Sequence, residues 1–344
     1  MEQSPLQSTP LGAFRFNTDS SKLEYYDGNQ WVSVTSTSPE VQTGGGRGLF
    51  GGGCTTPGGA NDLHVNTIDY VNLSTTGNAA DFGDLTVRRD FLSSFASRTR
   101  GFWLTGVDPG TEGKNEVDYV TIASLGNAID FGNTSSAQRG SGGISDQTRG
   151  ILPGVNGGTN VIDYWTMTSA GNAIDFGDMY VAAGSGAGVN SSTRGITAGG
   201  DAPADTDVIQ YLTISTLGNT ADFGDLSLAR GYVVGADSAT RGLFMTGYDA
   251  SPGVNVNTIE YVTIATLGNA TDFGDTVVTA RNAAGTSDCI RGVFAGGYNW
   301  PNGNRNTASY IIIPTTGNAV DFGDCTVSLR QRGTGGSNGH GGLG

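Results

Sequence analysis

One block of sequence recurs along the chain and strongly limits what it can fold into. The block reads Gly-Asn-Ala/Thr-x-Asp-Phe-Gly, and successive copies begin 45 to 50 residues apart. A repeat of this length is one supersecondary unit, which buries its apolar face by stacking on its neighbours. The copies begin at Gly77, Gly126, Gly171, Gly218, Gly268 and Gly317. We therefore expect an array of six similar units.

Two further blocks repeat in step with the first. An Arg-Gly pair opens an apolar run that ends in glycine, as in RGLFGGG from Arg47. A later run alternates apolar and polar residues around a tyrosine, as in IDYVNL from Ile68. This period of two is typical of a strand with one buried face, so both runs are predicted strands. The Arg-Gly pairs begin at Arg47, Arg100, Arg149, Arg194, Arg241 and Arg291.

Composition favours strands over helices throughout the chain. The 57 glycines indicate many tight turns and close backbone approaches. Strong helix formers such as Lys, Glu, Met and Gln are scarce, whereas Thr, Val, Ile, Tyr and Phe recur in short alternating runs. The sequence therefore predicts an all-β protein.

Each unit holds four predicted strands. Read from Leu226, they are a strand of small residues, the Arg-Gly strand, the tyrosine strand and the Asp-Phe-Gly strand. That content suits one four-stranded blade of a β-propeller. The order resembles the kelch repeat, although a phenylalanine such as Phe82 stands where a tryptophan is usual. The resemblance implies a six-bladed kelch-like β-propeller over residues 41–344.

The two ends of this array complement each other. The first copy has no strand of small residues before Arg47, and the chain ends with a surplus one, TVSLRQRGTGG from Thr326. Closed sheet arrays avoid open edges when the first and last units share strands. We expect the C-terminal strand to complete the unit begun at Arg47, which closes the propeller by strand exchange between the termini.

Residues 1–40 lie outside the repeat. The segment from Gly12 to Val34 predicts three strands, with turns at residues 18–21 and at Asp27-Gly28, because Asp-Gly between alternating runs is a hairpin signal. A β-meander this small does not hold itself together, so we expect it to pack on a partner. The linker TSTSPEVQTGGG follows. The expected domains are therefore residues 1–40 and 41–344.

The N-terminal segment also resembles a known module. RFN, then KLEYYDG, then a tryptophan and a valine, resemble a short module of bacteriophage structural proteins, particularly tail fibres. The resemblance covers Phe14 to Val34 and implies attachment to other virion proteins through residues 1–40. The aromatic residues expected to carry this attachment are Phe14, Phe16, Tyr25, Tyr26 and Trp31.

The repeated aspartates and arginines could serve chemistry or structure. Paired carboxylates are possible calcium ligands or acid–base groups. A catalytic site needs one asymmetric constellation, whereas a feature of every unit more naturally holds each unit together. We therefore expect structural Asx turns and Arg–Asp ion pairs within or between units. The aspartates are Asp81, Asp130, Asp175, Asp222, Asp272 and Asp321.

Several function classes find no support in the sequence. The net charge of -14 argues against binding a phosphate backbone. The chain has two histidines, His64 and His340, and three cysteines without a CxxC pair, so we expect no metal and no cofactor. The cysteines are expected to be buried free thiols. No nucleophile or phosphate-loop motif is present, so no enzyme is expected. No apolar run is long enough to span a membrane.

The loops between the Arg-Gly and tyrosine strands differ from unit to unit, and are long in the first, fifth and sixth. Variable loops on a rigid scaffold are where recognition usually sits. Aromatic and amide side chains there suit a sugar or a protein partner. The candidate binding residues are Tyr248, Asp249, Tyr298, Trp300 and Asn302.

Together these features predict a bacteriophage virion protein on the tail or capsid surface. We expect a tail fibre or appendage, present in several copies, whose propeller presents loops to a host-surface glycan or protein. Two alternatives stay open. The chain could be a capsid decoration or assembly protein, or a cellular kelch-like scaffold that binds protein partners.

Overall fold

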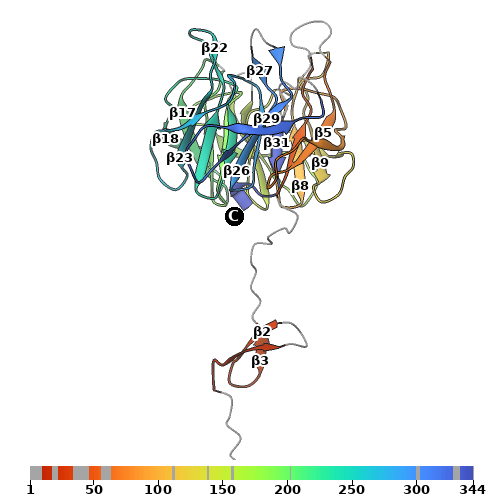
Figure 1. Cartoon of the computed structure of the whole chain (residues 1–344), viewed down its shortest axis with the longest axis vertical. Helices are drawn as coiled ribbons and strands as arrows, with labels where there is room; N and C mark the ends of the chain where they lie inside the picture. The colour runs from red at the N-terminus through yellow and green to blue at the C-terminus, as the bar shows by residue number, and fades with distance from the viewer. Residues whose placement is uncertain are drawn as a thin grey trace, which may run out of the picture. The chain divides into compact units, whose positions relative to one another are not determined.

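The computed structural model describes residues 10–17, 22–33, 46–55, 63–110, 113–137, 139–155, 159–201, 203–299, 303–327 and 334–343. The chain divides into two compact units, Met1–Thr43 and Gly44–Gly344 (Figure 1). Strands dominate both units, and the one helix in these residues is the 3-10 helix η1 (Gly341–Leu343). The predicted all-β composition is confirmed.

The first unit is a three-stranded antiparallel sheet in the order β1-β2-β3. Its strands are β1 (Phe14–Asn17), β2 (Lys22–Tyr26) and β3 (Trp31–Ser33). Asp27 fixes the second turn, because its Oδ1 accepts the backbone N–H groups of Asn29 and Gln30, both at 2.8 Å. These hydrogen bonds, that from Gln30 first, lower the pKa of the Asp27 carboxyl.

The second unit contains six four-stranded antiparallel sheets, numbered I to VI here in chain order. Sheet I consists of β31 (Thr334–Ser337), β4 (Arg47–Gly51), β5 (Thr67–Asn72) and β6 (Ala80–Asp84). Sheet II consists of β7 (Ser93–Ala96), β8 (Arg100–Leu104), β9 (Glu116–Thr121) and β10 (Ile129–Asn133). Sheet III consists of β11 (Ile144–Ser145), β12 (Arg149–Val155), β13 (Thr159–Thr166) and β14 (Ile174–Asp178).

Sheets IV to VI repeat this arrangement. Sheet IV consists of β15 (Ala187–Asn190), β16 (Arg194–Ala198), β17 (Val208–Thr213) and β18 (Ala221–Asp225). Sheet V consists of β19 (Val234–Asp237), β20 (Arg241–Met245), β23 (Thr258–Thr263) and β24 (Thr271–Asp275). Sheet VI consists of β25 (Ala284–Ser287), β26 (Arg291–Ala295), β29 (Thr307–Ile312) and β30 (Val320–Asp324).

A C-terminal strand completes the sheet that begins at Arg47. Strand β31 pairs antiparallel with β4, with Ser337 opposite Gly48. It begins at Thr334, later than the predicted start at Thr326, and residues 328–333 lie outside the described part of the chain. Sheet I therefore contains segments from both ends of the second unit.

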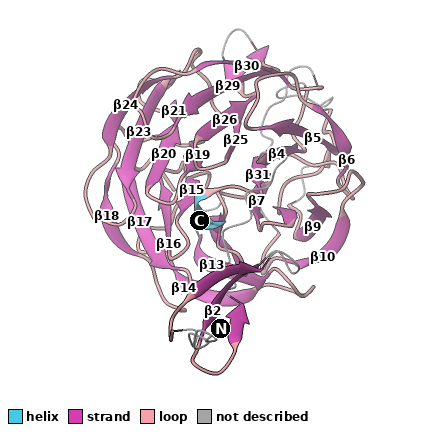
Figure 2. Cartoon of the chain, turned by 60° about the horizontal axis from the view of Figure 1, so that its bottom comes forward, coloured by secondary structure: helices cyan, strands magenta, loops and turns pink. Residues whose placement is uncertain are grey.

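The first strands of the six sheets form a continuous inner row. Strands β31, β7, β11, β15, β19 and β25 each contact the next, and β25 contacts β31 (Figure 2). Glycine allows this close approach. A Cβ atom on Gly235 would lie 2.4 Å from the carbonyl oxygen of Gly188, and one on Gly285 would lie 2.4 Å from that of Gly235. The small-residue strands of the sequence are these inner strands.

The core lies between adjacent sheets. One cluster combines Ile196 and Phe223 of sheet IV with Phe244 of sheet V, all buried. The phenylalanine of each Asp-Phe-Gly block is buried, and it meets the tyrosine of its own sheet edge to ring, as Phe223 meets Tyr211 with centroids 6.0 Å apart. Each sheet thus buries its apolar face only against a neighbour.

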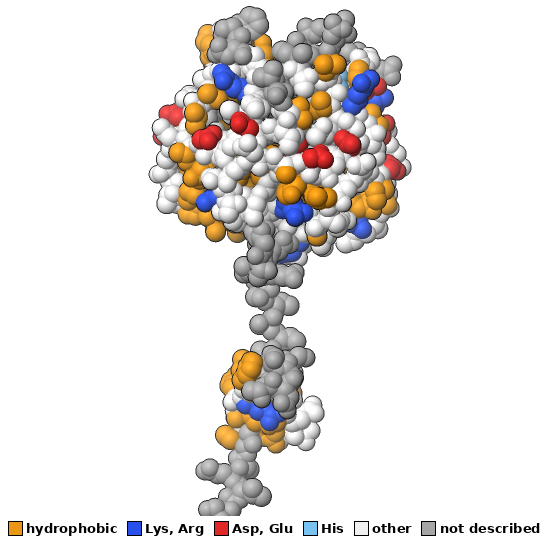
Figure 3. Space-filling view, turned by 45° about the vertical axis from the view of Figure 1, so that its right-hand side comes forward, with side chains coloured by type: hydrophobic (Ala, Val, Ile, Leu, Met, Phe, Trp, Pro, Cys, Tyr) orange, Lys and Arg blue, Asp and Glu red, His pale blue; other side chains and the backbone are white. Residues whose placement is uncertain are grey.

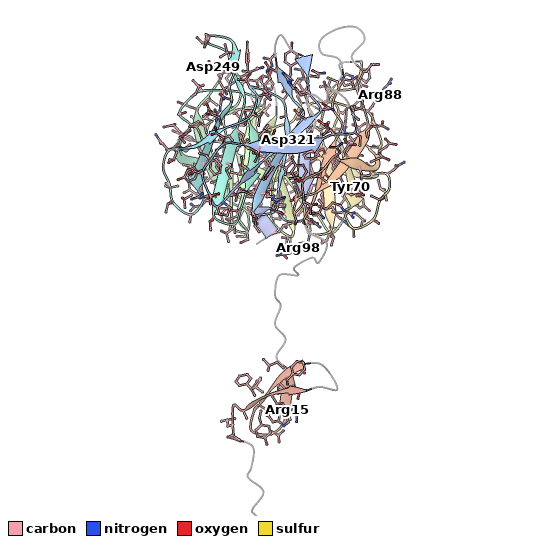
Figure 4. All side chains as sticks on the ribbon, viewed as in Figure 1. Arg15, Tyr70, Arg88, Arg98, Asp249 and Asp321 are labelled. Carbon is pink, nitrogen blue, oxygen red and sulfur yellow. The ribbon has the colours of Figure 1, made fainter. Side chains whose placement is uncertain are left out.

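Two short hairpins extend sheets V and VI at the same end of the second unit (Figure 1). Strands β21 (Tyr248–Asp249) and β22 (Val254–Asn255) form the first, and β27 (Tyr298–Asn299) and β28 (Gly303–Asn304) form the second. We call this the hairpin end. The C-terminus lies at the opposite end (Figure 1), where Arg98 (Figure 4) donates to the Leu343 carbonyl.

Candidate functional site

The repeated Gly-Asn-Ala block joins each sheet to the one before it. The backbone N–H of Gly126 donates to the carbonyl of Phe82 at 2.9 Å, and that of Ala128 donates to the carbonyl of Asp84 at 2.8 Å. The side-chain oxygen of Asn127 accepts the N–H of Asp84 at 3.1 Å. The same three bonds recur at all six junctions, including that from sheet VI to sheet I. The block covers the outer edge strand of each preceding sheet.

The predicted Arg–Asp pairs are wrong, because the ion pairs among the described residues include none of these twelve side chains. Strand alternation places each of these aspartates on the solvent face, beside a buried phenylalanine. The Arg241 guanidinium carbon lies 4.7 Å from the Tyr261 ring centroid, and its Nη1 donates to the Ile313 carbonyl of the next sheet at 2.9 Å. The other five arginines do the same: Arg47, Arg100, Arg149, Arg194 and Arg291.

Two other arginines form buried ion pairs. Arg89 contacts Asp118 at 3.0 Å and Arg230 contacts Glu260 at 2.8 Å, with all four side chains almost fully buried. Burial lowers the pKa of both arginines and raises that of Asp118, and in each case the opposite charge counteracts this effect. Each arginine precedes the first strand of the sheet whose third strand carries its carboxylate, so these pairs are structural contacts around sheets II and V.

A polar side chain on the third strand also accepts a hydrogen bond from the segment that follows the preceding sheet. Oδ1 of Asp118 accepts the hydroxyl of Thr86 at 2.7 Å, and Oδ2 of Asp163 accepts the N–H of Ser135 at 2.9 Å. Gln210 fills the same place in sheet IV, where its Oε1 accepts the N–H of Val181. Burial raises the pKa of the Asp163 carboxyl.

The centre of the second unit holds a hollow of about 130 Å³ that is narrowed at the hairpin end. Phe91 of sheet II and Tyr232 of sheet V line it there, with ring centroids 6.5 Å apart. Both residues adopt left-handed backbone conformations, with φ of 53° and 58°. The two sheets lie opposite each other in the inner row, so these rings meet across its centre.

The C-terminal segment fills the other end of the inner row. The Gly341 N–H donates to Oδ1 of Asp237 at 2.7 Å, and Nε2 of His340 lies 2.8 Å from the Ala96 carbonyl. Burial raises the pKa of Asp237, and nearby His340 opposes that rise. Sequence reasoning missed this role of His340, because a glycine-rich tail carries no strand or helix signal. The histidine is therefore a structural contact.

A cavity of about 580 Å³ lies off the centre, at the hairpin end between sheets V and VI. Tyr248, Tyr298 and Arg281 line it. The Arg281 guanidinium carbon lies 4.2 Å from the ring centroid of Tyr248 and 5.3 Å from that of Tyr298. Asn255 fixes one wall, because its Nδ2 donates to the Tyr298 carbonyl at 2.9 Å. This volume falls within the range of about 300–1,000 Å³ that ligand pockets occupy.

The structure brings together some of the predicted binding residues. Tyr248 and Tyr298 line the cavity, and Asp249 stabilises its hairpin by accepting the Ser251 N–H at 2.8 Å. Trp300 and Asn302 lie outside the described residues. Sequence reasoning missed Arg281, whose position varies between sheets: it is glycine in sheets IV and V, at Gly184 and Gly231, but arginine in sheet III, at Arg139. This variation between sheets was the available signal.

The first unit exposes an apolar face. Phe14 and Phe16 lie opposite Tyr25 and Leu23 across β1 and β2, on one face of the sheet. Phe14 is 68% exposed and Phe16 is 63% exposed, as the hydrophobic side chains of this unit in Figure 3 illustrate. Tyr26 and Trp31 are half-buried on the opposite face, where Arg15 lies 4.2 Å over the Trp31 ring.

Among the residues described here, no group of three or more His, Cys, Asp and Glu side chains could hold a metal ion. Cys54 and Cys325 are buried, and burial raises the pKa of the Cys289 thiol to about 11. The described part of the chain has no helix of the length and apolarity that crossing a membrane requires.

No family model matches this chain, and the search of curated proteins finds no match either.

Proposed function

We propose that the second unit is a six-bladed kelch-like β-propeller, closed by the pairing of β31 with β4. Two observations support this fold. The six sheets carry the same junction bonds, including Gly77 N–H to Phe322 carbonyl between the last sheet and the first. The inner strands also contact one another in a closed sequence.

We further propose that the protein is a structural protein of bacteriophage virions, a tail fibre or appendage present in several copies. The observation that carries this proposal is the exposed apolar face of the first unit, with Phe14, Phe16, Leu23 and Tyr25. A three-stranded sheet with such a face has its natural place against another protein. The resemblance of Phe14 to Val34 to a phage module supports the proposal that this partner is a virion subunit.

The role of the second unit in this proposal is recognition without covalent chemistry. Its junctions are alike, whereas its loops differ between sheets, and the hairpins of sheets V and VI border the cavity with Arg281 and Tyr248. Loops on a rigid scaffold suit binding of a host-surface glycan or protein. The proposal involves no cofactor and no nucleic acid.

The test compares full-length chain with a variant that carries Phe14→Ser and Phe16→Ser. We expect the variant to be lost from purified phage particles, as measured by mass spectrometry, because its apolar face no longer buries against a subunit. Its second unit should unfold at the unchanged temperature. A matched control, Tyr180→Ser, removes an exposed aromatic from the second unit and should leave incorporation intact.

The other outcomes point to the alternative functions. Absence of the wild-type chain from particles contradicts the virion proposal and favours a cellular scaffold. If electron cryomicroscopy finds the chain in particles with its hairpin end buried against the shell, the chain is a decoration or assembly protein.

A further inference from the structure

Arg281 differs from the arginines that hold the second unit together. Arg89 and Arg230 direct their guanidinium groups at buried carboxylates. Arg241 donates to a carbonyl of the neighbouring sheet. Arg281 has no such partner in the described residues: no ion pair or side-chain hydrogen bond involves it, and its Nε is buried without an acceptor. Its donors therefore remain for a ligand.

Three tyrosine rings hold this guanidinium in place. Its carbon lies 4.2 Å from the ring centroid of Tyr248, 5.3 Å from that of Tyr298 and 5.8 Å from that of Tyr232. Stacking on aromatic faces compensates part of the lost hydration but uses none of the N–H donors, which point outward in the guanidinium plane. The side chain is thus positioned and only half-exposed, with its hydrogen-bonding edge unused.

The carboxylates near this cavity are engaged elsewhere. Asp249 accepts the Ser251 N–H at 2.8 Å, and Asp205 accepts the Ala250 N–H at 2.6 Å, so both stabilise the β21–β22 hairpin. Neither forms an ion pair with Arg281. A ligand with one negative charge would therefore meet an unpaired cation and aromatic faces together.

We propose that the cavity between sheets V and VI binds an acidic saccharide, with Arg281 holding the sugar carboxylate and Tyr248 stacking on the sugar ring. A planar carboxylate matches the fork of a guanidinium, which forms two parallel hydrogen bonds with it. The apolar face of a sugar ring matches a tyrosine ring. This inference rests on the proposed recognition function and names the ligand class for it.

The experiment titrates D-glucuronate into the full-length protein and follows binding by saturation-transfer-difference NMR. D-glucose is the neutral match and acetate supplies a carboxylate without a sugar. We expect glucuronate to bind at least about tenfold more tightly than either, since both the charge-assisted hydrogen bonds and the stacking are needed. Arg281→Ala should weaken glucuronate binding by about tenfold or more.

Two further variants sharpen the result. Arg281→Lys keeps the charge but loses the fork, so it should also bind glucuronate more weakly than wild type. Arg88→Ala removes an exposed arginine at the same end of the second unit but outside the cavity, and should bind glucuronate as wild type does (Figure 4).

Equal affinity for glucose and glucuronate, or unchanged affinity in Arg281→Ala, overturns the proposal. Equal affinity for acetate and glucuronate overturns its saccharide part, and tighter binding of a glutamate-rich peptide assigns the cavity to a protein partner instead. These results leave particle incorporation through Phe14 and Phe16 untouched. Conversely, if the chain is absent from phage particles, the glucuronate titration still tests whether the cavity binds an acidic saccharide.

Discussion

The junctions between sheets and the cavity at the hairpin end contrast sharply in how they use arginine. At every junction the repeated arginine stacks on one tyrosine and donates to a carbonyl of the next sheet, as Arg241 does. In the cavity the Arg281 side chain stacks on three tyrosines and makes no hydrogen bond to another residue in the described part of the chain. The difference teaches that the repeated arginines belong to the scaffold, whereas an arginine whose side-chain donors are unused marks a candidate site.

The largest effect should come from breaking a buried ion pair of the scaffold. Asp118→Ala leaves the fully buried guanidinium of Arg89 without its closest carboxylate. We expect a loss of about 3–5 kcal/mol in the free energy of unfolding, measured by urea titration. The matched change Gln210→Ala, in a sheet without this ion pair, should cost less. Equal losses in the two variants would show that leaving the Arg89 charge unpaired adds no cost to the free energy of unfolding.

The next effect should come from the inner row of strands. A methyl group in Gly235→Ala would lie 2.4 Å from the Gly188 carbonyl oxygen, so we expect a loss of about 1–3 kcal/mol. Gly171→Ala is the control, since a Cβ there meets nothing within 4 Å. If both variants unfold at the same urea concentration, the close approach of the inner strands is not a constraint.

A smaller effect should follow from removing one junction arginine. Arg241→Ala loses a stacking contact with Tyr261 and a hydrogen bond to sheet VI. We expect a cost of about 1–2 kcal/mol by urea titration. The exposed Arg88→Ala should cost about 0.5 kcal/mol or less. An Arg241 variant as stable as the Arg88 variant would contradict the junction role.

The period of the sequence made much of the scaffold predictable. The positions of the strands, the six units and the C-terminal strand that pairs with β4 all follow from alternation and spacing. The partner of each repeated arginine could not be predicted from alternation and spacing. Spacing shows which residues recur, but whether Arg241 meets Asp272 or the Ile313 carbonyl depends on how two sheets pack across a junction.

The candidate site was less predictable than the scaffold. Tyr248 and Tyr298 were predicted as loop residues, but Arg281 reaches them from the segment before β25, and only the fold brings the three together. The C-terminal contacts of His340 were missed for the same reason. Both depend on spaces that form only when sheets pack together: sheets V and VI for the Arg281 cavity, and all six inner strands for the hollow beside His340.

A pH-dependent effect on stability should come from the buried carboxyl of Asp163, which accepts the Ser135 N–H. Burial raises the pKa of this carboxyl in the folded state. The protonated carboxyl therefore adds to the free energy of unfolding below about pH 4, and this contribution is lost as the pH rises through the raised pKa. Asp163→Asn avoids that loss. Its melting temperature should therefore rise relative to wild type between pH 4 and pH 7, as scanning calorimetry can measure.

The reverse substitution provides the control for Asp163. Gln210→Glu places a carboxyl at the same position of sheet IV, so its stability should fall relative to wild type as the pH rises over that interval. If the difference in melting temperature from wild type stays the same at every pH for both variants, then burial at these two positions does not disfavour the charged carboxylate.

The smallest effect on stability should come from the cavity. Arg281→Ala removes stacking at a half-exposed position but no hydrogen bond or ion pair within the described residues, so we expect a change of about 0.5 kcal/mol or less by urea titration. A loss as large as that of Arg241→Ala would make Arg281 another scaffold arginine.

The most direct measurement gives both arginine variants the same two assays, the urea midpoint and the affinity for D-glucuronate. We predict that Arg241→Ala unfolds at lower urea concentration and binds like wild type, whereas Arg281→Ala unfolds like wild type and binds at least about tenfold more weakly. If each variant changes both quantities, or if Arg281→Ala changes only stability, then scaffold and recognition are not separated in this protein.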